Sequence, residues 1–590
     1  MDLYQKFFDQ FAAQFHLLRK KYRIVGTVRL VVVLAIIYLF YKFLSTEQSS
    51  YLWVVLGLVV FFIILMRIHM SMSWKMRYHQ ALMELNEEEI GFLRDKKKPF
   101  DDGKEFLQQQ HPYAYDLDIF GAQSLFQFLN RTASYVGKFQ LAGLLNQVLT
   151  PKEILENQEA VKELSTQIEW RQNISALSKM APIHANEYEK IKHWASNSAE
   201  TLSTVRLIAS FAVPALLLIA ILGTWLLEHT FWGYLVSLLF TANLILATSK
   251  TRDIQKEIVG ADKIHETIQN YSLIIRKIEK SEFKGAKLQR FVALFTEGER
   301  SVSQELKELS AYFEKINTIA NVFVMVVFNG FFQYHIHVLN GLLKWKKQHA
   351  PAVPKWLDAI GELEALNALA NYSYNNRGYC FPVLNTEGKM NFKDLGHPLI
   401  DASKRVSNDI DFTNQRFVIL TGSNMSGKST FLRTVGVNLI LAGIGAPICS
   451  SKASFFPMPL FVSMRLEDSL SDSESYFYAE VKRLKLIVES VKEEPCFVLL
   501  DEILRGTNSD DKQSGTIGVI LKLIQDQTFG MIATHDLEVC EITKDHPTIL
   551  TNKCFEVEMH DDELFFDYKI YDGICKNKNA TFIMKKMGII

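Results

Sequence analysis

Four apolar runs stand out against the charged, helically periodic remainder of the chain. They are Ile24–Leu44, Tyr51–Ile68, Leu207–Leu227 and Thr230–Ser249. Each approaches the length of about 20 apolar residues that a helix needs to cross a bilayer. The charged residues in the first two runs lie near the ends, where long side chains can reach the membrane surface. The pattern predicts two membrane hairpins, 24–68 and 201–249. A buried helical hairpin is the alternative interpretation of the first.

Basic residues flank these hairpins and predict their orientation. The clusters of Lys and Arg are 20–23, 67–77 and 250–256. The short turns 45–50 and 228–229 contain neither residue type. Because basic flanks stay on the cytoplasmic side, we expect both turns outside and the other segments in the cytoplasm. Residues 1–23 are then a basic cytoplasmic lead that can lie on a membrane surface. A cleavable signal peptide is not expected, because the following apolar run is long and lacks a small-residue cleavage site.

The remaining segments up to the last third of the chain are predicted to be helical. Residues 69–200 form a helical core with polar connectors, and 250–345 form a long, charged, lever-like region. Acids and bases nearly balance in the second segment, which favours a solvated helix face over a DNA-gripping surface. Two prolines mark a connector at 346–395, and this connector contains a further predicted helix over Trp356–Tyr374.

Overall charge and cysteine content narrow the function classes. Lys+Arg and Asp+Glu balance at 65 each, so no global basic field indicates nucleic acid, although a local basic patch is compatible with these numbers. The six cysteines all lie between Cys380 and Cys575, without C-x-x-C spacing. This is typical of reduced thiols in a cytosolic compartment, and we expect no disulfide partner and no zinc site.

The strongest chemical signal is a phosphate-binding loop. Its residues are Gly422, Ser423, Asn424, Met425, Ser426, Gly427, Lys428, Ser429 and Thr430. An apolar strand precedes the loop and a helical pattern follows it. Gly422 and Gly427 allow backbone angles that point N–H groups into an anion nest at the positive end of the helix. Lys428 would reach the β- and γ-phosphates of ATP, and the Ser429 hydroxyl would bind Mg²⁺.

Two later apolar strands end in residues that would complete an ATPase site. One ends in Asp501 and Glu502, and the next in Thr534 and His535. Asp501 would hold the Mg²⁺ ion and Glu502 would act as general base for the attacking water. Ligands of α/β folds bind at the carboxyl ends of strands, which favours His535 as a γ-phosphate sensor. Two acids that merely cap a strand, and a structural histidine, are the alternative interpretations.

A fifth uncharged stretch, Ile316–Leu343, lacks the uniform apolar character of the four runs. It contains asparagine, glutamine, glycine and histidine. An odd number of crossings would also place the nucleotide-binding segment outside, where ATP is scarce. We therefore expect this stretch to be a buried helix of the soluble part or a dimer face.

The motifs are in an order and at spacings that resemble the ATPase domain of the MutS family of ABC-type ATPases, over residues 390–590. The matching words are Gly396-His397-Pro398, Ser407–Ile410, Thr421–Thr430, Ala442–Gly445, Arg465 with Asp468, Ser475-x-Phe477-x-x-Glu480, Asp501–Thr507 and Ala533–His535. Segments Ser124–Leu164 and Trp356–Ala370 are similar to the helical core of the same family. The resemblance covers roughly half of the chain.

The resemblance implies roles for specific residues. Gly422–Thr430 would bind the ATP phosphates, with Ser429 and Asp501 on Mg²⁺ and Glu502, His535 and Lys428 as catalytic residues. Ser475 matches the signature serine that a second subunit lends across the interface. It implies a homodimer with two composite sites, which ATP closes and hydrolysis releases. Duplex DNA, mismatched or branched, is a partner by family resemblance only.

The chain also departs from the family pattern. No counterpart of the N-terminal mismatch-reading domain is recognised, because the membrane hairpin occupies that region. Phe295-Thr296-Glu297 matches the residue pattern of the family's Phe-x-Glu wedge, but it falls within a helical run. Tyr476 replaces the usual threonine and Leu504 the usual glycine. The second hairpin interrupts the region that leads toward the family's DNA clamp, so membrane helices are expected to replace or tether that clamp.

Together these predictions describe a multidomain protein. Its α-helical membrane hairpins and all-α core and lever are followed by a C-terminal α/β P-loop ATPase domain at 396–590. The expected function is that of a membrane-anchored, dimeric ATPase of mismatch-repair type. A membrane-side ATP-driven mechanochemical protein that acts on a lipid or protein partner without DNA is one alternative. An ABC transporter is another, although the chain has no Leu-Ser-Gly-Gly-Gln signature and few polar residues in its spans.

Overall fold

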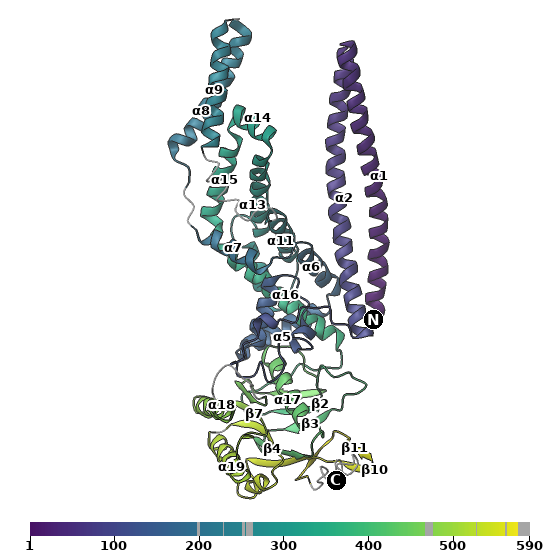
Figure 1. The fold of residues 1–590 in the computed structure, drawn as a ribbon, viewed down its shortest axis with the longest axis vertical. Helices are drawn as coiled ribbons and strands as arrows, with labels where there is room; N and C mark the ends of the chain where they lie inside the picture. The colour runs from purple at the N-terminus through teal and green to yellow at the C-terminus, as the bar shows by residue number, and fades with distance from the viewer. Residues whose placement is uncertain are drawn as a thin grey trace.

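The computed structural model describes an elongated molecule with the two hairpins at one end and the sheets at the other (Figure 1). It describes residues 1–197, 201–227, 229–249, 254, 264–465, 476–526, 528–560 and 563–575. Helices fill the middle of the molecule, between the hairpins and the sheets. The helical middle therefore connects the hairpins to the sheets.

Two very long helices form the first hairpin. Helix α1 spans Asp2–Thr46 and α2 spans Ser49–Asp95, so the basic lead and the apolar run are parts of one continuous helix. Only 6% of the most apolar window of each helix is buried. The base of the hairpin packs against the helical middle through Tyr4, Phe7 and Ile168. The upper part of the hairpin therefore presents an apolar surface that no described part of the chain covers.

The second hairpin is shorter and equally apolar. Helix α8 spans Thr204–Leu227 and α9 spans Thr230–Thr248. With α1 and α2, they make four helices in the described chain that are long and apolar enough to cross a membrane. Both hairpins extend to the same side of the helical middle (Figure 1). This shared direction is the one that anchoring in a single bilayer requires.

The fifth apolar stretch, expected to be a buried helix or a dimer face, is broken into several helices. It begins in α13 (Val302–Asn317) and η2 (Thr318–Ala320), and it continues in α14 (Val322–Phe332) and α15 (Tyr334–His349). The chain bends by 107° between the α13–η2 segment and α14. A second break lies at Gln333, whose φ of 47° falls in the left-handed region. At the first break the Asn321 side chain caps the start of α14, and at the second the Gln333 backbone N–H donates to carbonyl oxygens of the last turn of α14.

The helical middle is built around one long helix, α16 (Val353–Asn375), which is buried along most of its length. The expected helix over Trp356–Tyr374 is confirmed, and Pro354 lies in its first turn, where a missing N–H costs nothing. The helices around it are α3 (Leu125–Leu129), α4 (Tyr135–Leu145), α5 (Pro151–Ser165), α6 (Ile168–Met180), α7 (Ala185–Ser196), α11 (Ile264–Glu279) and α12 (Ala286–Thr296), with η1 (Lys104–Phe106) before them and η3 (Ala350–Ala352) leading into α16. Residues Ser124, Ser134 and Thr150 cap three of them.

Two sheets and their helices form the C-terminal part. The larger sheet has the order β12-β9-β4-β8-β7-β6, and all of its neighbouring strands are parallel except β12 and β9. Its strands are β4 (Phe417–Gly422), β6 (Leu460–Ser463), β7 (Phe497–Asp501), β8 (Phe529–Ala533), β9 (Leu550–Phe555) and β12 (Ile570–Asp572). Strands β4, β7 and β8 are buried on both faces, as parallel sheets covered by helices are.

The smaller elements complete this part. A second sheet of order β1-β5-β2-β3 is formed by β1 (Val383–Leu384), β2 (Asn391–Leu395), β3 (Asn408–Asp411) and β5 (Lys452–Phe455). The helices are α17 (Lys428–Gly443), α18 (Tyr476–Ser490), α19 (Ser509–Gln525) and η4 (Glu538–Lys544), and β10 (Glu558–His560) pairs with β11 (Glu563–Phe565).

An acidic turn of the helical middle is joined to the sheet domain by ion pairs. Asp118 lies 2.7 Å from Arg433 of α17 and 2.5 Å from Arg465, which follows β6. The buried Asp116 accepts hydrogen bonds of 2.8 Å from the backbone N–H groups of Met464 and Arg465. Helix α17 begins in the predicted phosphate loop, so these contacts connect that loop directly to the helical middle.

Candidate nucleotide site

The segment between β4 and α17 has the backbone shape of an anion nest. Gly427 has a φ of 104° and Met425 a φ of 68°, both in the left-handed region. A Cβ atom at Gly427 would also lie 3.1 Å from the Tyr568 ring. Helix α17 begins at Lys428, immediately after this loop. Its unpaired N–H groups and positive dipole end therefore face the loop, which suits a phosphate group.

Lys428 is buried, and its Nζ atom donates hydrogen bonds of 3.0 Å to the carbonyl oxygens of Gly422 and Ser423. Burial lowers the pKa of its ammonium group, while the nearby carboxylates of Glu502 and Asp501 raise it. A buried cation that is held only by carbonyl oxygens can exchange these for the stronger phosphate partner without moving the helix.

Asp501 ends β7 beside the start of α17. Asp501 is 7% exposed, and its Oδ1 atom has no hydrogen-bond partner among the described residues. Burial raises the pKa of the Asp501 carboxyl group, and a hydrogen bond with the Ser429 side chain opposes this rise. A divalent cation between Ser429 and Asp501 would satisfy the free oxygen and compensate the buried charge.

Glu502 follows Asp501 and is paired with the residue that ends the neighbouring strand. The Oε1 atom of Glu502 lies 2.5 Å from Nε2 of His535. This hydrogen bond is the main reason that the pKa of Glu502 is lowered to about 2, and burial opposes it. Arg505 donates to the Glu502 backbone carbonyl from 2.9 Å. His535 and Arg505 therefore hold the ionised Glu502 carboxylate at the carboxyl edge of the sheet.

The loop after Glu502 is strained where the family resemblance indicates glycine. Leu504 has a φ of 62°, which is unfavourable for a residue with a Cβ atom, and Glu502 has a φ of 50°. The backbone N–H of Leu504 donates to Glu480 Oε1 of α18 from 2.7 Å, and the leucine side chain is buried. This packing and hydrogen bond hold the backbone conformation that a glycine would adopt more easily.

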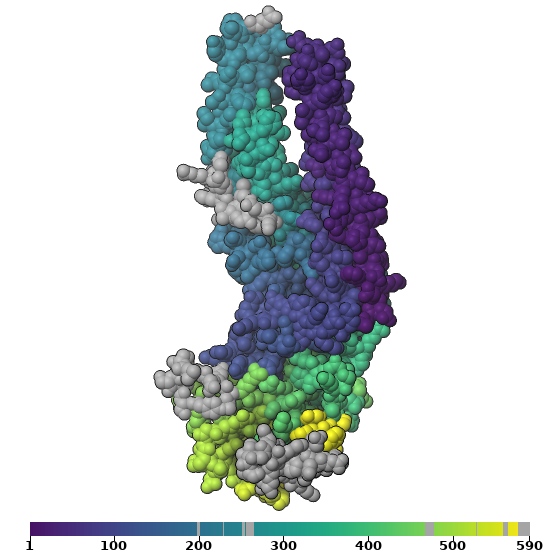
Figure 2. All heavy atoms as spheres, turned by 45° about the vertical axis from the view of Figure 1, so that its right-hand side comes forward, coloured from purple at the N-terminus to yellow at the C-terminus, as the bar shows by residue number. Residues whose placement is uncertain are grey.

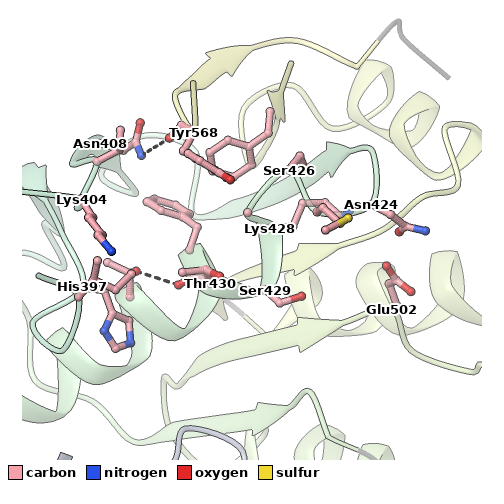
Figure 3. Close-up of a pocket in the computed structure, with 17 residues that line it drawn as sticks. His397, Lys404, Asn408, Asn424, Ser426, Lys428, Ser429, Thr430, Glu502 and Tyr568 are labelled. Atoms are coloured by element: carbon pink, nitrogen blue, oxygen red, sulfur yellow. Dashed lines mark hydrogen bonds between the residues drawn. The ribbon is translucent and has the colours of Figure 1, made fainter. Parts of the chain in front are cut away.

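A cavity of about 470 Å³ opens beside the loop, and it is lined by the loop, the start of α17, Glu502 and residues of the segments around His397 and Tyr568. Figure 3 shows Glu502 at one side of it and His397 and Lys404 at the other, with Tyr568 above the loop. Burial, assisted by the charges of Arg433 and Arg405, lowers the pKa of His397 to about 4. His397, Lys404, Asn408 and Tyr568 were not predicted as site residues, although His397 and Asn408 belong to matched motifs.

The residues present fit ATP and Mg²⁺. The hydroxyl groups of Ser423 and Ser426 are buried without a hydrogen-bond partner among the described residues, as is Asp501 Oδ1. Unpaired buried polar atoms are costly, and here they cluster at the loop and the acid that phosphate and Mg²⁺ would occupy. Of the predicted site residues, those of the loop, Asp501, Glu502 and His535 lie together. Ser475 lies outside the described residues.

Comparisons with known proteins concern the same part of the chain. The family description MutS domain V matches residues 418–589. The DNA mismatch repair protein MutS of Thermotoga petrophila is 32% identical over 248 residues, which are 41% of this chain and 31% of that protein. MutS protein homolog 4 of Homo sapiens is 30% identical over 243 residues, which are 39% of this chain and 25% of that protein. The chain thus spans less than a third of the length of either relative.

Proposed function

The chain belongs to the MutS family through its domain V, and from this premise we propose that it is a membrane-anchored ATPase whose active sites are shared between two copies. The observation that carries the proposal is the meeting of the loop Gly422–Thr430 with Asp501 and Glu502 at the carboxyl edge of one parallel sheet. In such sheets, ligands bind at this edge.

The roles of the residues follow from their environments. The loop N–H groups and Lys428 would hold the phosphates, and Ser429 with Asp501 would hold Mg²⁺, which supplies positive charge against the developing charge of the phosphoryl group. Glu502 would orient the attacking water and accept its proton. His535 keeps the Glu502 carboxylate ionised and in place. By family resemblance, His535 would also sense the γ-phosphate.

Two copies of the chain are part of the proposal. Ser475 would be lent to the site of the partner, so that each ATP lies between subunits. Glu480 of α18 contacts the loop after Glu502 and offers a path from the signature segment to the general base. ATP binding would close the two domains and hydrolysis would release them.

The hairpins support membrane anchoring. Residues such as Trp53, 71% exposed, and Trp225, 83% exposed, belong to uncharged helical surfaces far larger than soluble monomers expose. With the basic flanks in the cytoplasm, the ATPase domain would face the cytoplasm as well. The domain boundaries follow: hairpins at 24–68 and 201–249, helical core and lever between and after them, and ATPase domain from 396.

DNA is the partner by family resemblance, since the relatives carry mismatch-repair names. The four apolar helices, which are largely uncovered, favour a second candidate function. In it, the same ATPase domain acts on a lipid or protein partner at the membrane. DNA binding that falls steeply with salt would support the first candidate. DNA-independent turnover with no salt-dependent binding of duplex, mismatched or branched DNA would support the second.

Replacing the general base tests the proposed chemistry. Glu502→Gln should retain ATP binding and lose turnover by at least about a hundredfold, the usual contribution of a general base. Glu538→Gln, at the exposed start of η4, is the matched control and should leave turnover unchanged. Full turnover by Glu502→Gln would refute the assigned base.

A further inference from the structure

Helix α14 is a short and strongly apolar element, and part of its surface is not covered by any described part of the chain. Its sequence from Val322 to Phe332 contains no charged residue. Val322 and Phe323 are each 71% exposed, and Phe332 is 53% exposed. A helix that is apolar all round is normally buried in a core or surrounded by lipid. Exposure of such side chains to water would cost about 25 cal/mol per Å² of apolar surface.

The contacts of α14 and α15 place this helix at the level of the second hairpin. Arg206 of α8 contacts Ser249 after α9, which marks the cytoplasmic ends of the two spans. Asn243 of α9 donates to the Gly330 carbonyl from 3.0 Å. Asn243 precedes Ser249 by six residues, a rise of about 9 Å. The C-terminal end of α14 therefore lies about 9 Å into the span, on the membrane side of its boundary.

A second contact gives a similar depth from the other helix. His337 at the start of α15 lies 3.2 Å from the Ser210 carbonyl of α8, and its ring packs against Phe211. Ser210 follows Arg206 by four residues, a rise of about 6 Å. Figure 2 shows the α13–α15 atoms beside the second hairpin and facing the first. Both helices of the hairpin thus place the turn after α14 inside the apolar zone.

The polar groups at both ends of α14 are satisfied by protein, as a segment away from water requires. Asn321 caps the first turn by accepting from the N–H groups of Phe323 and Val324. At the other end, Gln333 donates to the side chain of Asn243 from 2.7 Å. Asn329 accepts from the backbone N–H of His335 at 3.0 Å. These amide side chains are 2% exposed or less at Asn243, Asn329 and Gln333.

We propose that α14 lies inside the cytoplasmic leaflet of the bilayer as a re-entrant helix, with its exposed face covered by lipid acyl chains. The proposal rests on the proposed membrane anchoring. At about 1.5 Å per residue its 11 residues span about 16 Å, roughly half of a hydrocarbon core about 30 Å thick. The helix therefore enters and returns without crossing, and the ATPase domain stays on the cytoplasmic side. Ile208 and Ile245, near the cytoplasmic ends of the hairpin, are likewise apolar and exposed.

Site-directed spin labelling of the full chain in lipid nanodiscs tests this. The label is placed at Phe323→Cys and, independently, at Val322→Cys, with the signal of the unsubstituted chain subtracted. Leu238→Cys, 66% exposed on α9, is the reference for lipid. Glu314→Cys on the exposed face of α13 is the reference for water. Collision rates with oxygen, which concentrates in lipid, and with a water-soluble nickel chelate are then measured.

The expected result is high oxygen and low nickel accessibility at positions 322 and 323, as at 238, with the reverse at 314. Nickel accessibility at 322 and 323 with a lipid reading at 238 would overturn the inference and leave the anchoring intact. Nickel accessibility at 238 as well would overturn the anchoring itself. Low accessibility to both reagents with spin–spin broadening would show a second copy on the α14 face, which also overturns the inference.

Discussion

Glu502 and His535 end neighbouring parallel strands, and their side chains approach to 2.5 Å between Oε1 and Nε2. The two residues are separated by a helix and a strand in sequence and become partners only because β7 pairs with β8. The contact lowers the pKa of Glu502 to about 2, so the carboxylate is ionised throughout the physiological range. In the proposed mechanism, a base held ionised and oriented in this way would be ready for water before the substrate arrives.

Removing the histidine should move the acid limb of the pH–rate profile. In His535→Ala the pKa of Glu502 rises toward its ordinary value of 4.5, because the main cause of its depression is gone. Loss of rate on acidification then begins at higher pH than in the unsubstituted protein. The measurement is kcat for ATP between pH 4 and 8 in both proteins.

The direction of the pH effect on stability follows from the lowered pKa of Glu502. A depressed carboxyl pKa stabilises the folded state above the ordinary value of 4.5, and this stabilisation is lost as pH falls toward about 2. His546→Ala is the control, since that side chain does not line the cavity. An acid limb in His535→Ala that stays at the unsubstituted position would contradict the assigned coupling.

Mixed subunits should recover activity if the sites are shared. In a heterodimer with Lys428→Ala in one copy and Ser475→Ala in the other, both substitutions fall in the same composite site. A heterodimer of the two variants retains one complete site, so its ATPase rate should approach half of the unsubstituted rate. Each variant alone should be inactive. A mixture no more active than the separate variants would count against composite sites.

Glu89 should be critical for the junction between the first hairpin and the helical middle. It is 6% exposed, pairs with Arg131, and accepts from the Asn371 and Asn375 amides at 2.8 and 3.1 Å. Glu89→Ala leaves these donors buried and unpaired, at a cost of about 3–5 kcal/mol in the free energy of unfolding. Glu87→Ala, on the exposed face of the same helix, should have almost no effect. Denaturant unfolding in detergent measures both, and equal effects would refute this role.

A methyl group at Gly330 should displace α14 from the hairpin. A Cβ atom there would lie 2.3 Å from the Phe240 ring, whereas one at Gly233 meets nothing within 4 Å. Gly330→Ala should raise the mobility of a spin label at Phe323. Gly233→Ala should leave it unchanged, and should stabilise α9 by up to about 1 kcal/mol through helix propensity. Equal mobility in the two variants would mean that α14 does not depend on this contact.

The candidate nucleotide site was largely predictable because its residues belong to short sequence motifs. The loop from Gly422 to Thr430 is contiguous, and Asp501, Glu502 and His535 each end an apolar strand. The edge at which these strands meet follows from the rules for parallel sheets. His397 and Tyr568 could not be assigned in this way, because each reaches the cavity from an irregular segment outside the large sheet.

The break of the fifth apolar stretch was not predictable from local pattern. No proline marks Asn321 or Gln333, and Asn321 caps α14 only through the N–H groups of Phe323 and Val324. Gln333 reaches Asn243, which is 90 residues away in sequence. Conversely, the change in composition near residue 23 marks no structural boundary, since charged and apolar residues belong to one helix, α1. Composition indicates the environment of a helix and not its ends.

Flotation of the full chain with lipid vesicles, followed by ATPase assay of each fraction, tests the central claim most directly. After a high-salt wash, the unsubstituted chain should float with the vesicles and hydrolyse ATP there, and Glu502→Gln should float equally well without hydrolysis. Protein and ATPase activity that remain in the soluble fraction, or floated protein without ATPase activity, would contradict the account of a membrane-anchored ATPase.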